Sequence, residues 1–229
     1  TNGTTDIFVK DLQTGSLQRV STSASGVQGD GTSSEFSTSA DGRYVVFSSD
    51  ASNLVAGDAN AASDVFVKDI LTGAIQRVST DSLGREAAGG DSGTTHPAVL
   101  TQDGRYVIFD SAASNLVAGD TNGVSDIFRK DLVTGEVKLV SGSIAGALGD
   151  GESGRYYAVS ASADGRYIAF ESAATNLVPG GANADKYGEQ VDAIYLKDML
   201  TGAIRCVSTD ASGVLGDNSS YAPVLSSDG

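Results

Sequence analysis

The chain has 229 residues, of which 29 are acidic and 15 are basic, and its formal net charge at pH 7 is −14. This acidity excludes the basic footprint that nucleic-acid phosphates require, and it disfavours binding to an anionic membrane surface. No run approaches the roughly 20 apolar residues of a membrane span, so we expect no membrane insertion. The single cysteine, Cys206, excludes an internal disulfide. Abundant glycine and 40% hydrophobic residues are typical of a turn-rich β protein.

Near-identical segments recur along the chain. The stretch Asn115–Asp131 returns almost letter for letter as Asn53–Asp69, and its second half opens the chain as Thr1–Asp11. A looser copy spans Asn176–Asp198. Self-similarity at a regular period of about 61 residues indicates a repeat architecture.

Each repeat has three landmarks in a fixed order. An Asp-Gly-Arg-Tyr turn leads into a β-branched and aromatic run, as in Asp41–Phe47. An Asp-Ile/Val-Phe-x-Lys-Asp run follows, as in Asp64–Asp69, and then a Thr-Gly turn leads into a short run, as in Thr72–Val78. The Asp-Gly and Thr-Gly pairs supply the positive φ angles that tight hairpins need, and the runs between them favour strands. With a short segment before each Asp-Gly, such as Pro223–Ser226, we expect four strands per repeat.

Tandem four-stranded antiparallel meanders predict an all-β fold, a β-propeller of four-stranded blades. A β-sandwich is the alternative, although sandwiches rarely carry near-identical units. We expect the whole chain to form one array. Its predicted complete blades are residues 33–80, 94–141 and 155–209, with 1–23 supplying the third and fourth strands of a partial blade and 219–229 supplying only a first strand.

The partial blade lacks a second strand. Either the chain, which we expect to be a mature or excised segment, is a window from a longer array, or another chain fills the gap. Unpaired sheet edges attract pairing partners. We therefore expect the partners to be other copies of this chain or flanking propeller repeats, with a surface polysaccharide or protein as a further candidate.

Four motifs recur together: a serine in the first strand, the Asp-Gly-Arg-Tyr turn, the Ser-Asn-Leu-Val-x-Gly-Asp connector and the Asp-Ile-Phe strand. This combination resembles the TolB-like, WD-type propeller repeats of bacterial secreted and cell-surface proteins, and the resemblance covers the whole chain. It implies a secreted, extracellular or cell-surface location. It does not fix the function, because propellers serve as binding platforms, enzyme scaffolds and structural units.

The connector between the second and third strands carries the best candidate metal ligands, which lie at positions 1, 3 and 7 of an Asp-x-Asn-x-x-x-Asp spacing. The candidates are Asp58, Asn60 and Asp64, then Asp120, Asn122 and Asp126, and in the opening copy Asn2 and Asp6. Calcium takes six to eight oxygen ligands at about 2.3 to 2.6 Å, so this loop predicts a Ca²⁺ site. The alternative is that these side chains cap their own loop backbone in Asx-turns.

The fourth copy departs from this pattern. Gly181 replaces the first aspartate, and an insertion within Asn183–Asp192 adds Asp185 and Glu189 as substitute ligands. We expect no equivalent ion site there. The insertion is the best place for a binding function specific to one blade, with a neutral loop extension as the alternative.

The basic residues are also periodic, and we expect them to pair with neighbouring aspartates. One position holds Lys10, Lys68, Lys130 and Lys197; a second holds Arg43, Arg105 and Arg166; and a third holds Arg19, Arg77, Lys138 and Arg205. Exposed pairs of this kind contribute at most about 1 kcal/mol each.

Catalytic motifs are sparse. His96 is the sole histidine, and no Gly-x-Ser-x-Gly elbow marks a nucleophile. The sequence therefore predicts a non-catalytic extracellular propeller module with a structural or adhesive role, one that polymerises into a fibre or array by completing its open blade. The alternative is the propeller domain of a secreted polysaccharide- or peptide-processing enzyme.

Overall fold

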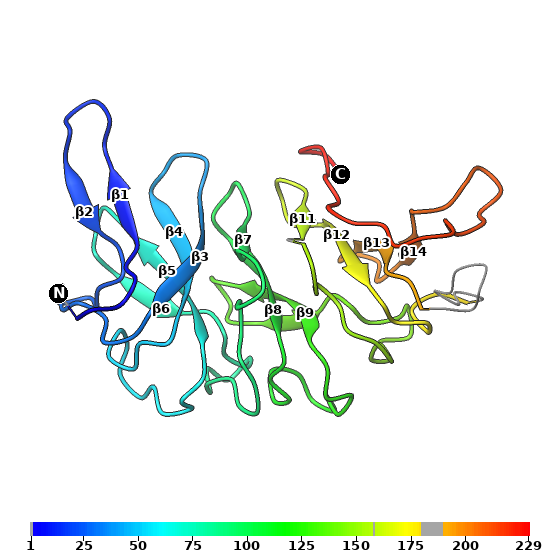
Figure 1. Ribbon diagram of the computed structural model, residues 1–229, viewed down its shortest axis with the longest axis horizontal. Helices are drawn as coiled ribbons and strands as arrows, with labels where there is room; N and C mark the ends of the chain where they lie inside the picture. Colours follow the sequence, from blue (N-terminus) through cyan, green and yellow to red (C-terminus); the bar gives the residue numbers. More distant parts are fainter. Residues whose placement is uncertain (1, 158, 180–189) are drawn as a thin grey trace.

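The computed structural model describes residues 2–157, 159–179 and 190–229, and all regular secondary structure in these ranges is β-strand. Three four-stranded sheets and one two-stranded sheet follow one another along the longest dimension of the molecule (Figure 1). Within each sheet, every strand pairs antiparallel with the strands next to it in the chain. The predicted all-β fold with four-stranded antiparallel units is confirmed. No helix in the described ranges could cross a membrane.

The strands are assigned to the sheets in chain order. The first sheet contains β1 (Phe8–Lys10) and β2 (Leu17–Arg19). The second contains β3 (Ser33–Thr38), β4 (Tyr44–Ser49), β5 (Asp64–Asp69) and β6 (Ile75–Arg77). The third contains β7 (Val99–Leu100), β8 (Tyr106–Ser111), β9 (Asp126–Asp131) and β10 (Val137–Leu139). The fourth contains β11 (Ser160–Ala161), β12 (Tyr167–Ser172), β13 (Ala193–Asp198) and β14 (Ile204–Cys206).

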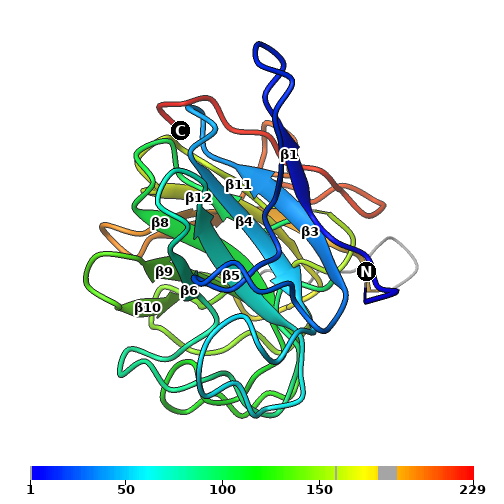
Figure 2. The same cartoon turned by 90° about the vertical axis from the view of Figure 1, so that its left-hand side faces the viewer.

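The core lies between successive sheets. The middle strands of each sheet are buried on both faces, which explains their continuous apolar runs. Within the second sheet Phe47 and Phe66 stack with ring centroids 5.8 Å apart, and the third and fourth sheets repeat this pair. One apolar cluster joins Val46 and Val65 of the second sheet to Phe109 of the third. Figure 2 shows the sheets behind one another when the array is viewed from its first sheet.

The Asp-Gly turns form as predicted. Gly42 has a φ of +70°, which a residue with a side chain rarely adopts. The Asp41 carboxylate accepts hydrogen bonds from the Ser39 hydroxyl at 2.6 Å and from the Arg43 backbone N–H at 3.0 Å. Arg43 then reaches Asp69 at 2.7 Å, and Arg105 and Arg166 make the same pairing in the next two sheets. The prediction that these three arginines pair with aspartates is confirmed.

The periodic lysines behave differently from the prediction of aspartate pairing. The Lys68 ammonium group donates to the backbone carbonyls of Thr22 and Ser23, which belong to the preceding sheet. Lys130 and Lys197 repeat this contact with carbonyls of the sheet before their own. All three lysines are buried. Carbonyl oxygens at the end of the preceding sheet replace the expected aspartates, so these lysines fasten one sheet to the next.

The two ends of the array differ from its middle. β1 pairs only with β2, and its residues are exposed or half-buried, whereas the equivalent strand β5 is buried along its whole length. The expected strand at Pro223–Ser226 does not form a ladder. The end segment instead lies beside β11, where the Leu225 N–H donates to the Ser160 hydroxyl and the Ala163 N–H donates to the Ser227 carbonyl, both at 2.9 Å.

Candidate functional site

The connector asparagines bridge neighbouring loops. In the second sheet the Asn60 amide NH₂ donates to Asp64 at 3.1 Å and to the Ala87 carbonyl at 3.0 Å. Its oxygen accepts the Ala62 N–H at 3.1 Å. Asn122 repeats all three contacts in the third sheet. Each asparagine oxygen therefore faces its own loop, as in an Asx-turn, and its NH₂ group faces the aspartate.

The opening copy keeps the contacts of the asparagine with the loop backbone but not its hydrogen bond to the aspartate. Asn2 donates to the Gly29 carbonyl at 2.5 Å, and its oxygen accepts the Thr4 N–H at 3.1 Å. Asp6 accepts hydrogen bonds from Ser21 at 2.7 Å and from Gln28 at 2.8 Å. The structure therefore brings Asn2 and Asp6 into one loop, and the Arg19 guanidinium, the counterpart of Arg77, lies 3.5 Å from the Asp6 carboxylate.

In the second sheet an arginine occupies the centre of the predicted ion site. Nη1 of Arg77 lies 3.3 Å from Asp58, 2.9 Å from Asp64 and 2.9 Å from Glu86, and Nη2 donates to the Gly57 carbonyl. The Arg77, Asp58 and Asp64 side chains are each less than a tenth exposed. Burial raises the pKa of Asp58, while Arg77 opposes that rise. The guanidinium is the cation that these buried carboxylates require.

The third sheet lacks this arginine. The residue paired with Phe128 is Leu139, whereas Arg77 pairs with the equivalent Phe66. Asp120 and Asp126 are both buried there. Burial, and secondarily the charge of Asp126, raises the pKa of Asp120, and burial also raises the pKa of Asp126. Two carboxylates therefore share a site in which no side-chain cation of the described residues pairs with either of them.

The strand register corrects the predicted third basic position. Arg19 and Arg77 are equivalent, but Lys138 and Arg205 lie one residue earlier, opposite Arg129 and Leu196. The true counterparts of Arg77 are Leu139 and Cys206. A one-residue offset moves a strand side chain to the other face, so Lys138 and Arg205 cannot reach the connector.

The position beside the predicted ion site therefore holds Arg77 in the second sheet and Leu139 in the third. Among the described residues, no group of three or more His, Cys, Asp or Glu side chains is placed to hold a metal ion. Gly181, Asp185 and Glu189, the positions singled out in the fourth copy, lie outside the described residues. Asp192 lies within them, and its backbone N–H donates to the Ser219 hydroxyl at 3.1 Å.

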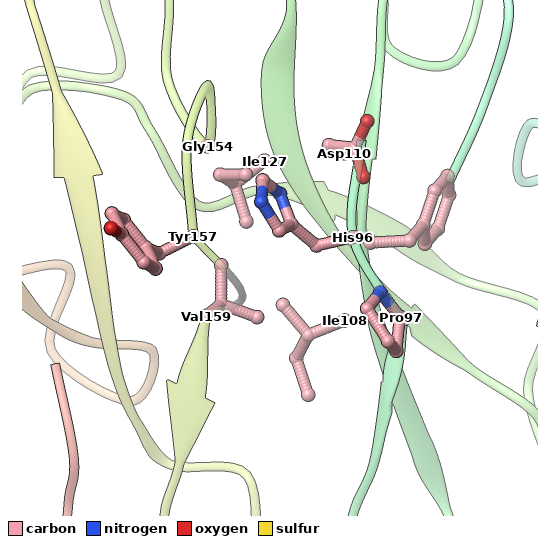
Figure 3. Close-up of a pocket in the computed structure, with 9 residues that line it drawn as sticks. His96, Pro97, Ile108, Asp110, Ile127, Gly154, Tyr157 and Val159 are labelled. Atoms are coloured by element: carbon pink, nitrogen blue, oxygen red, sulfur yellow. The ribbon is translucent and has the colours of Figure 1, made fainter. Parts of the chain in front are cut away.

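A second candidate site surrounds His96, in the segment that precedes β7 of the third sheet. The His96 ring contacts the Tyr156 carbonyl of the fourth sheet, and within the described ranges it makes no hydrogen bond to a serine hydroxyl. A small pocket beside it is bounded by His96, Tyr157 and Asp110 (Figure 3). This geometry contains no Ser-His-Asp relay.

Two buried carboxylates occupy equivalent strand positions near His96. Asp110 on β8 pairs with Ile127, and Glu171 on β12 pairs with Ile194. These are the positions that Ser48, which pairs with Val65, has on β4. Burial raises the pKa of both carboxyl groups. Sequence reasoning missed them. The sequence does mark these two blades, because Gly93–Thr95 and Gly154–Tyr156 are three-residue insertions relative to the second sheet.

Comparison with known proteins shows the fold. No protein-family model and no curated protein matches the sequence. A structure of the tricorn protease aligns with a TM-score of 0.52 at 12% identity, covering 98% of this chain and 18% of that one. A prolyl endopeptidase structure aligns with a TM-score of 0.50 at 14% identity, covering 87% of this chain and 25% of that one. A TolB from Agrobacterium tumefaciens gives a TM-score of 0.42 at 16% identity, with 88% and 59% covered.

The chain has a β-propeller fold. Its sheets are propeller blades, of which three have four strands and one has two. The chain spans only a fraction of the length of each of these structures, and at such low identities the likeness extends to the fold alone. The assignment to TolB-like, WD-type repeats stays a prediction.

Proposed function

We propose that this chain is a non-catalytic extracellular propeller module with a structural or adhesive role, and that it assembles by adding strands to its two-stranded blade. The observation that carries the proposal is the open edge of β1. Phe8 on this strand is 48% exposed, whereas its counterpart Phe66 in the second blade is fully buried. A strand that is central in the other blades is therefore an edge here.

The open edge presents unpaired backbone groups. On β1 the Asp11 N–H and the Ile7 carbonyl bond toward β2. Because bonding direction alternates along an antiparallel strand, the N–H groups of Phe8 and Lys10 point the other way. These N–H groups would donate hydrogen bonds to the carbonyls of an added strand, in the manner of β-strand addition. The added strand would come from another copy of the chain or from flanking repeats.

Substitution of Lys10 by proline tests this mode of assembly. Proline removes an N–H on the open edge and spares the bonds between β1 and β2. We expect the unaltered protein to form fibres or arrays at high concentration, seen by electron microscopy and sedimentation velocity. Lys10→Pro should remain monomeric, while Lys10→Ala should assemble normally. Discrete monomers of the unaltered protein at high concentration would contradict the proposal.

We also propose that calcium stabilises the array at the third blade. Asp120 and Asp126 are the two close, buried carboxylates that have no arginine between them, and carboxylate oxygens are preferred calcium ligands. In the second blade Arg77 already supplies the positive charge. The chelation experiment given in the Discussion tests this site.

The second candidate function is that of a propeller domain in a secreted enzyme that processes polysaccharide or peptide. The observation that favours it is the pair Asp110 and Glu171, because carboxyl groups with raised pKa values can act as general acids. Turnover in a panel of polysaccharide and peptide substrates, abolished by Asp110→Asn, would support the enzyme. An inactive panel would favour the non-catalytic module.

A further inference from the structure

The pocket beside His96 combines apolar walls with an aromatic mouth. It lies between the starts of the first strands of the third and fourth blades, and His96 and Tyr157 approach it from these two blades (Figure 3). Ile108, Ile127 and Val159 form its walls. Its free volume is about 10 Å³, which is room for one water-sized group.

One carboxylate faces this apolar pocket. Asp110 is 8% exposed, and one of its oxygens accepts the Thr95 hydroxyl at 2.7 Å. Burial raises the pKa of Asp110, and it makes no ion pair with a lysine or arginine of the described chain. A charged carboxylate in such surroundings is stabilised by a ligand of opposite charge.

Aromatic rings form a row that begins at the pocket with His96 and Tyr157 and continues away from it. The ring centroids of His96 and Tyr157 are 6.3 Å apart, and those of Tyr157 and Tyr221 are 5.3 Å apart. Tyr156 packs on Tyr221 at 5.7 Å. Ring faces attract cations, and the chain already places one there, since the Arg155 guanidinium lies 4.9 Å from the Tyr156 ring centroid.

A second buried carboxylate lies close to this row. Glu171 is 1% exposed; one of its oxygens accepts the Tyr156 N–H, and the other has no hydrogen-bond partner among the residues that the structure describes. His96 lies within electrostatic range of both Glu171 and Asp110. Two buried carboxyl groups from consecutive blades therefore lie near the aromatic rings.

We propose that this pocket binds the ammonium group of a lysine side chain from a partner protein. An ammonium group is about the size of the water-sized space, and it would pair with Asp110. The aliphatic walls would enclose the ammonium group alone, and the lysine methylenes would extend outward past the rings of His96 and Tyr157. An amino-sugar nitrogen sits directly on a bulky ring, which the narrow pocket excludes. The net charge of −14 favours approach of a basic partner.

Proton NMR titration offers a direct test, because His96 is the only histidine and its ring signals are unique. The probe is Nα-acetyl-lysine-N-methylamide, and the corresponding norleucine amide, which lacks the ammonium group, is the neutral control. We expect the lysine amide to shift the His96 signals in a saturable way and the norleucine amide to leave them unchanged. A glucosamine tetramer tests the amino-sugar source and should not bind.

Matched variants locate the binding group. Asp110→Asn keeps a partner for Thr95 and should weaken binding of the lysine amide at least about tenfold. Tyr157→Leu should weaken it about threefold, through the lost ring face. Asp50→Asn removes the same charge from an exposed position and should change it less than about twofold. Thermal melts establish that each variant is folded.

Four results would overturn the proposal. They are no saturable shift with the lysine amide, equal shifts with the norleucine amide, unchanged affinity in folded Asp110→Asn, and tighter binding of the glucosamine tetramer. None of these depends on assembly through β1, so the lysine site and the proposed structural role can fail separately.

Discussion

Replacing Arg77 by leucine is the sharpest test of how the second blade is held together. Leucine is the residue that the third blade places at the equivalent position, Leu139, so the side chain suits the local backbone. In the second blade, however, the change leaves Asp58 and Asp64 buried without their cation. Glu86 loses the same partner at 2.9 Å.

The expected cost follows from burial. Removing one partner from a buried ion pair typically destabilises a protein by about 3 to 5 kcal/mol, because a desolvated charge remains. For a chain of this size, each kcal/mol corresponds to about 2 to 4 °C in Tm, so Arg77→Leu should lower Tm by about 6 to 20 °C. The deficit should shrink as the pH falls from about 8 to about 5, because native carboxylates with raised pKa values take up protons.

Differential scanning calorimetry with a matched control measures this effect. Arg43→Leu breaks a pair whose arginine side chain is 42% exposed, and it should cost at most about 1 kcal/mol. Adding Asp58→Asn to Arg77→Leu removes one stranded charge and should recover part of the loss. Equal Tm changes for Arg77→Leu and Arg43→Leu, or a deficit that does not vary with pH, would refute the reasoning.

Three further predictions address the ion site, acid stability and packing. Calcium should raise Tm and a chelator should lower it, an effect that Asp120→Asn abolishes; a melt indifferent to calcium would exclude the site. Although burial opposes it, hydrogen bonds from Arg105 and from the Thr134 and Val133 N–H groups lower the pKa of Asp131 to about 2. Its contribution to stability is therefore complete above about pH 4 and lost as the pH falls to about 2, so the Tm difference between the unaltered protein and Arg105→Gln should vanish over that range. A difference that persists at pH 2 would contradict this assignment. Finally, a Cβ on Gly31 would lie 2.5 Å from the Asp50 backbone, so Gly31→Ala should cost about 1 to 3 kcal/mol, whereas Gly216→Ala, with its nearest neighbour at 3.7 Å, should be nearly neutral in urea titrations.

Much of the fold could be predicted because each blade repeats the same local chemistry. Asp41 and Gly42 dictate a tight turn, and the apolar run of β4 requires burial on both faces. Periodicity predicted that Arg43 pairs with an aspartate, and the structure identifies that aspartate as Asp69. These features depend on neighbours in sequence or on one strand ladder, which a repeat reveals directly.

The candidate sites were less predictable because they depend on register and on contacts between blades. The pattern of Asp58, Asn60 and Asp64 indicated three converging oxygens, but Asn60 turns its NH₂ group toward Asp64. A one-residue misalignment hid the exchange of Arg77 for Leu139. Only the folded array brings His96 and Tyr157, which are separated by a whole repeat, to opposite sides of one pocket.

The lysines that fasten the blades all contact the blade that precedes their own in the chain. Lys68, Lys130 and Lys197 each reach carbonyls made about 45 to 55 residues earlier in the chain, and none of these contacts points forward. During synthesis, the docking surface for each new blade is therefore complete before its lysine leaves the ribosome. Each new blade can therefore dock through its lysine onto the blade before it, starting from the N-terminal end, whereas contacts such as that of Arg129 with the Gly165 carbonyl form only once the next blade has been made.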